Sequence, residues 1–122
     1  MDVRALALAA LLLGACGPPN PSPPDGGANS CGDTLPASCP SAAPSYAADV
    51  APLVSSRCVA CHGPGGVSSE KPLGSYPQLF QRRETTLVEL HDCLMPPKAA
   101  APLTASERHA LERWLVCGAP DN

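Results

Sequence analysis

Aromatic and basic residues are both scarce in this chain. Aromatic side chains make up only 3% of its 122 residues, and Lys and Arg number 8 against 11 acidic residues. A folded unit this short and this poor in large apolar side chains buries a thin core, so we expect disulfides or a cofactor to stabilise it. The net charge of −3 gives no basic surface of the kind that nucleic-acid binding needs, and we expect no nucleic-acid partner.

Long regular elements and long apolar runs are scarce as well. Sixteen prolines and ten glycines interrupt the sequence. The apolar run at 5–13 is too short to span a bilayer as a permanent helix. It follows Arg4 and has the form of a secretory signal, which we assign to residues 1–15.

A cysteine directly follows this signal. Residues 13–16 read Leu-Gly-Ala-Cys and resemble the lipobox of bacterial lipoproteins, in which the cysteine is acylated and becomes the mature N-terminus. The resemblance implies lipidation of Cys16 and a stable membrane anchor, because several acyl chains hold where one does not. It also implies the bacterial cell envelope, and Gly17 in place of aspartate favours the outer membrane, facing the periplasm. An ordinary cleaved signal is the alternative.

The segment after Cys16 is rich in proline, serine and glycine and has no apolar periodicity. Such a segment cannot form a core and is typical of a disordered tether. We therefore divide the chain into a signal (1–15), a lipidated cysteine with its tether (16–45) and a folded domain (46–122).

The folded domain contains the motif Cys58-Val59-Ala60-Cys61-His62. Residues three apart lie on one face of a helix, so the two thiols can bond to the vinyl groups of one haem while His62 presents an imidazole nitrogen to the iron. The pattern C-x-x-C-H is typical of c-type haem attachment. We predict one covalent haem c, held by Cys58 and Cys61, with His62 as an axial ligand.

Three other interpretations of this motif are weaker. A thioredoxin-type redox pair needs a strand–helix setting that is missing around Cys58. A structural zinc site wants four ligands, and only one C-x-x-C pair is present. A plain disulfide between Cys58 and Cys61 leaves His62 without a role.

Met95, in the sequence CLMPP at 93–97, is the predicted sixth ligand of the iron. A thioether sulfur is a good haem ligand that raises the reduction potential, and the two prolines restrict the loop that carries it. His91 and His109 are the rival candidates, and a methionine that fills a core gap is the structural alternative.

Capping and spacing signals predict three to four short helices. We expect a helix that begins near Asp49 and delivers the thiols at its end, a helical turn at 76–81, a short helix from Thr85 or Thr86 to His91, and a last helix after the capping box Thr104-Ala105-Ser106-Glu107. Trp114 in the last helix packs either on the haem or on the first helix. Because a metal-bound histidine usually donates its other N–H to a carbonyl or carboxylate, we predict that the Pro72 carbonyl accepts from His62.

Seven cysteines in so short a chain indicate an oxidising compartment. With Cys16, Cys58 and Cys61 assigned, four remain and allow three connectivities. We favour Cys31–Cys39 as a local loop and Cys93–Cys117 within the domain.

The segments CVACHG, CLMPP and LTASERHALERWLVCGAPDN together resemble the small cytochrome c domain family, most closely predicted bacterial lipoproteins with a Pro-rich linker. The likeness covers 46–122. It implies an all-α fold with first and last helices crossing beside the haem, thioether attachment at Cys58 and Cys61, and axial ligation by His62 and Met95. The stretch between the ligands is shorter than in larger members, which leaves more haem edge exposed. The Cys93–Cys117 pair also departs from them and would brace the ligand loop against the last helix.

These observations predict a membrane-anchored mono-haem c-type cytochrome that transfers single electrons in the cell envelope to a redox partner protein, and is not an enzyme. One alternative is a haem enzyme of peroxidase type, or a ligand sensor. In this alternative Met95 does not bind the iron, and the sixth coordination position of the iron stays open. The other is a surface lipoprotein without haem, stapled by disulfides.

Overall fold

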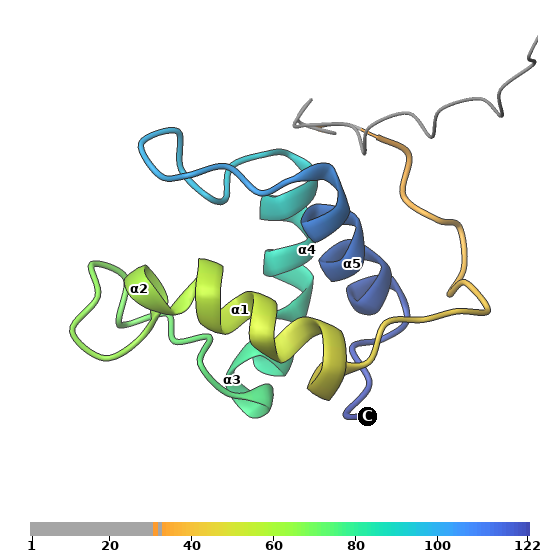
Figure 1. Cartoon of the computed structure of the whole chain (residues 1–122), viewed down its shortest axis with the longest axis horizontal. Coiled ribbons are helices and arrows are strands. Elements are labelled where there is room, and N and C mark those ends of the chain that lie inside the picture. The colour runs from red at the N-terminus through yellow and green to blue at the C-terminus, as the bar shows by residue number, and fades with distance from the viewer. Residues whose placement is uncertain (1–30, 32) are drawn as a thin grey trace, which may run out of the picture.

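The computed structural model describes Cys31 and residues 33–122. This part of the chain folds into helices and turns without a strand, which confirms the predicted all-α class. Its elements in chain order are η1 (Tyr46–Val50), α1 (Ala51–Arg57), α2 (Val59–His62), α3 (Tyr76–Gln81), α4 (Arg83–His91) and α5 (Ala105–Val116). In Figure 1, α4 and α5 lie side by side and α1 runs across them.

The predicted signal (1–15) and the lipidation site Cys16 lie outside the described residues. Among the residues that are described, no helix has both the length and the apolar content needed to cross a membrane.

Ser45 is the N-cap of the first helical segment, four residues before the predicted start near Asp49. The Ser45 hydroxyl accepts from the Ala48 N–H (3.3 Å), and the Asp49 carboxylate accepts from the Ser45 N–H (2.7 Å). Asp49 therefore caps the helix from within its first turn rather than from the cap position. The segment opens as one π turn, η1, and continues into α1 with Pro52 in the first turn, where a missing N–H is tolerated.

The other predicted helices form with small changes. The turn at 76–81 is α3, and α4 begins at Arg83, before the predicted start at Thr85 or Thr86. The capping box of α5 is complete, because the Thr104 hydroxyl accepts from the Glu107 N–H and the Glu107 carboxylate accepts from the Thr104 N–H. Gly118, at φ +83°, then ends the helix in the left-handed conformation that glycine adopts without strain.

The few aromatic residues gather in one cluster. Trp114 is fully buried, with its ring centroid 5.7 Å from that of Tyr46 and 6.4 Å from that of Tyr76. The Trp114 indole N–H donates to the Pro120 carbonyl and the Tyr76 hydroxyl donates to the Ala119 carbonyl, both at 3.0 Å. Of its two predicted environments, Trp114 thus takes the one beside the first helical segment.

Cys31 and residues 33–45 form what we call the strap, which runs beside the helical domain (orange to yellow in Figure 1). Two disulfides hold it, Cys31–Cys93 with Cα atoms 5.5 Å apart and Cys39–Cys117 with Cα atoms 4.5 Å apart. This part of the predicted tether is therefore covalently attached to the domain.

The predicted pairs Cys31–Cys39 and Cys93–Cys117 are wrong, although the same four cysteines are used. An extended chain advances about 3.3 Å per residue, so two cysteines of one strap can lie more than 20 Å apart. The strap brings Cys31 to the loop after α4 and Cys39 to the end of α5.

Candidate functional site

The predicted site residues line one cleft. It encloses about 970 Å³ with its open mouth included. Much of its wall is apolar and is formed by Val54, Leu73, Leu79, Leu90, Leu103 and Leu111. Cys58, Cys61, His62 and Met95 all belong to this wall, so the fold brings together four residues that the sequence had singled out.

Cys58 and Cys61 are the unpaired cysteines among the described residues, while the other four form disulfides. Cys58 lies at the junction of α1 and α2, and its carbonyl accepts from the N–H groups of Cys61 (3.1 Å) and His62 (2.8 Å). Burial raises the pKa of the Cys58 thiol to about 11, and the charge of Cys61 adds to the shift. Reactive redox thiols have lowered pKa values, so a raised pKa disfavours a thioredoxin-type role.

His62 is oriented by the loop that follows it. Its Nδ1 lies 2.8 Å from the carbonyl oxygen of Lys71, and in the tautomer with a proton on Nδ1 this ring nitrogen donates there and Nε2 keeps its lone pair. The predicted acceptor was Pro72, and this is wrong by one residue. The Leu73 N–H donates to the His62 carbonyl at 3.1 Å. This hydrogen bond fixes the position of the loop, so that the carbonyl of Lys71, two residues before Leu73, faces the His62 imidazole.

Gly63 and Gly66, which follow the motif, pack tightly against it. A Cβ atom at Gly66 would lie 2.2 Å from the Cys61 carbonyl oxygen, and one at Gly63 would lie 2.6 Å from that of Val59. Neither position leaves room for a side chain. The close spacing of the glycines in Gly63-Pro64-Gly65-Gly66 is the feature of the sequence that could have indicated this tight packing.

Met95 enters the cleft from the loop after α4. The N–H groups of Leu94 and Met95 both donate to the Glu89 carbonyl, at 2.8 and 3.0 Å, and this fixes the loop to the end of α4. Cys93 joins the loop to Cys31 of the strap, so the expected brace to the last helix through Cys117 is replaced by one to the strap.

The rival ligands His91 and His109 do not line the cleft. His91 Nδ1 lies 3.8 Å from Glu112 Oε1, and His109 Nε2 lies 3.2 Å from Asp33 Oδ2. Among the predicted sixth ligands, Met95 is the one that shares a wall with His62.

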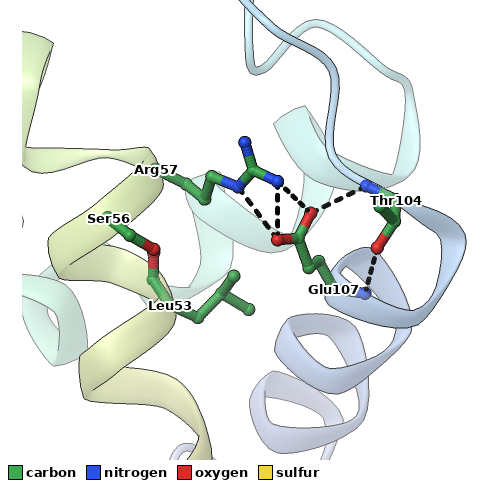
Figure 2. Close-up of polar contacts among 5 residues, drawn as sticks. All are labelled: Leu53, Ser56, Arg57, Thr104 and Glu107. Carbon is green, nitrogen blue, oxygen red and sulfur yellow. Dashed lines mark hydrogen bonds and ion pairs between the residues drawn. The ribbon is translucent and has the colours of Figure 1, made fainter.

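Basic side chains, which the sequence reasoning missed, also line the cleft: Arg57, Lys71 and Arg82. Figure 2 shows Arg57 reaching from α1 to Glu107 in the first turn of α5. Its Nε and terminal nitrogen donate to the two carboxylate oxygens at 2.9 and 3.1 Å. Desolvation raises the pKa of Glu107, but the hydrogen bonds from Thr104 and the charge and hydrogen bonds of Arg57 outweigh it and lower the pKa overall.

Within the described residues, no three His, Cys, Asp or Glu side chains gather as a ligand set for a metal ion. Comparison of the chain with protein-family models, with curated proteins and with solved structures finds no match.

Proposed function

We propose that this protein is a mono-haem c-type cytochrome that transfers single electrons. One observation carries the proposal: two unpaired thiols, one imidazole and one thioether share a largely apolar cleft, while the other described cysteines are in disulfides. This donor set fits a haem, whose apolar ring matches the leucine-rich wall and whose iron accepts nitrogen and thioether sulfur. The sequence resemblance to small cytochrome c domains supports the same assignment.

Each residue has a defined part in this function. Cys58 and Cys61 would form the two thioether bonds, and the Lys71 carbonyl would hold the His62 ring in the tautomer that leaves Nε2 free to bind. The Met95 thioether would supply a second ligand to the iron. The haem, when bound, supplies an iron that alternates between the ferrous and ferric states.

The chain would also exclude water and other ligands from the cleft. Leu73, Leu90 and Leu103, each at most 9% exposed, form part of the wall and keep water from the ring. If His62 and Met95 both bind the iron, they would keep peroxide and oxygen from binding there. This favours electron transfer over the open-site enzyme or sensor.

For the cellular setting we propose a lipid anchor at Cys16, the periplasmic face of the outer membrane and a redox partner protein. The form of the signal and of the lipobox supports the anchor. The two disulfides of the domain support an oxidising compartment, where such bonds persist.

The test is to express the full chain together with the cytochrome c maturation machinery and to record oxidised and reduced spectra. We expect covalent haem, a low-spin c-type spectrum and the weak near-infrared band of sulfur bound to ferric iron. Cys58→Ala with Cys61→Ala is the matched control and should carry no covalent haem. Haem without the near-infrared band would favour the open-site alternative, and absence of covalent haem would leave a disulfide-stapled lipoprotein.

A further inference from the structure

Two charged residues are buried between α4 and α5, and the proposed electron transfer gives them no role. Arg108 and Glu112, one turn apart on α5, are each 3% exposed. His91, at the end of α4, lies beside them, with Nδ1 3.8 Å from Glu112 Oε1. Three buried atoms of this trio have no hydrogen-bond partner: His91 Nδ1, Arg108 Nε and Glu112 Oε1. We call these three residues the buried ionic cluster.

The buried ionic cluster adjoins residues that line the cleft. Leu90 and Leu111 line the cleft, and the residues that follow them in sequence are His91 and Glu112. Arg108 also donates to the Leu90 carbonyl. The cluster is therefore in contact with one residue of the cleft wall and next in sequence to two, and charges interact more strongly through protein than through water.

The charges and the unpaired atoms around Glu112 allow one proton to bind there. It is faced by His91 from α4, by Arg108 and His109 from α5 and by Asp33 from the strap. Burial raises the pKa of Glu112 and outweighs the opposing effect of the nearby cations. The atoms His91 Nδ1 and Glu112 Oε1 face each other unpaired, and a proton on either one would relieve the cost of leaving both unsatisfied.

We propose that His91 and Glu112 form a proton-binding site coupled to the charge of the cleft, so that the protein binds a proton when it accepts an electron. The inference rests on the proposed function. One electron arrives from a one-electron donor protein and one proton arrives from water to the His91–Glu112 pair; no covalent bond of the chain breaks. Oxidation releases both.

The sign of the effect follows from charge. Reduction removes one positive charge from the cleft and so strengthens proton binding at the cluster. A bound proton in turn makes reduction easier. The reduction potential therefore falls as pH rises through the range in which the cluster titrates. Full coupling changes the redox equilibrium tenfold per pH unit, about 59 mV for one electron.

The experiment is a spectroelectrochemical titration of the full haem-loaded chain between pH 5 and pH 8. We expect the potential to fall with pH in the wild type and to lose most of that slope in Glu112→Gln and in His91→Gln. Glu84→Gln is the matched control, because this carboxylate lies in the first turn of α4 and is 89% exposed. It should keep the wild-type slope.

A pH-independent potential in the wild type overturns the inference without any variant, and so does a slope that survives both substitutions, because the proton then binds elsewhere. In both cases covalent haem is present and the proposed function stands. Absence of covalent haem overturns the proposed function and this inference with it.

Discussion

At the scale of single residues, Gly66 shows how closely the loop after the C-x-x-C-H motif packs against that motif. A Cβ atom there would meet the Cys61 carbonyl at 2.2 Å, and neither backbone can move without shifting the thiol. We predict that Gly66→Ala lowers the free energy of unfolding by about 1–3 kcal/mol, as overpacking does, and reduces the yield of covalent haem. Urea unfolding and the haem-to-protein absorbance ratio measure the two effects.

Gly74→Ala is the control for that substitution. A Cβ atom at Gly74 has its nearest neighbours at 3.8 Å, which is ordinary contact. It should leave both quantities close to those of the wild type. Equal effects of the two substitutions would contradict the proposed close fit.

Met95 carries the second prediction at this scale. We expect Met95→Ala to retain covalent haem, because both thiols are intact, but to lose the near-infrared sulfur band and to have a lower reduction potential. Spectra and a potentiometric titration check this. The His91→Gln variant should keep the band, since His91 lies outside the cleft. A wild type without the band, whose visible spectrum changes in His91→Gln and not in Met95→Ala, would instead make His91 the ligand.

The sequence predicted four residues that the fold brings to one cleft, but not the residues that position them. Cys58, Cys61, His62 and Met95 were identified from side-chain type and spacing. The carbonyl that faces His62 belongs to Lys71, not Pro72, because backbone acceptors depend on loop register and leave no mark in side-chain identity. The pairing of Arg57 with Glu107 joins residues 50 positions apart and has no local signal.

At the scale of elements, the Arg57–Glu107 pair links the end of α1 to the start of α5 at the edge of the cleft. The pKa of Glu107 is lowered on folding, so its contribution to stability is complete above its ordinary pKa of 4.5 and is lost as pH falls through the lowered value. We predict that Glu107→Gln costs about 1–2 kcal/mol at pH 7. The difference from the wild type should shrink below pH 4.5. Urea unfolding at several pH values measures it.

The control for this pH dependence is Glu84→Gln, which removes a carboxylate that is 89% exposed. It should change stability little at any pH. A deficit in Glu107→Gln that stays constant from neutral to acid pH would show that the carboxylate charge is not what links the two helices.

Element boundaries were predictable where a cap is local and less so elsewhere. The capping box at Thr104 placed the start of α5 correctly, since this signal lies within one turn of the boundary it sets. The start at Ser45 was missed because Asp49 is a good cap by residue type but acts here from the first turn.

At the scale of the whole molecule, the two disulfides make the strap part of the fold. Counting cysteines identified the four that pair, but their connectivity depends on the path of residues 33–45 across the domain, which no local pattern records. The observed bonds join residues 62 and 78 positions apart and so close far longer loops than the local pair that we favoured. Longer loops constrain the unfolded chain more.

Removal of one bond tests both its contribution and the pairing. We predict that Cys39→Ser with Cys117→Ser lowers the free energy of unfolding by about 2–4 kcal/mol. This variant should still keep Cys31 and Cys93 joined, so that alkylation of the denatured, unreduced holoprotein labels neither. Cys31→Ser with Cys39→Ser is the comparison, and it should leave Cys93 and Cys117 open to labelling. If the pairs were instead Cys31–Cys39 and Cys93–Cys117, the second variant would keep one bond and label at neither remaining cysteine, because removing one complete pair leaves the other intact.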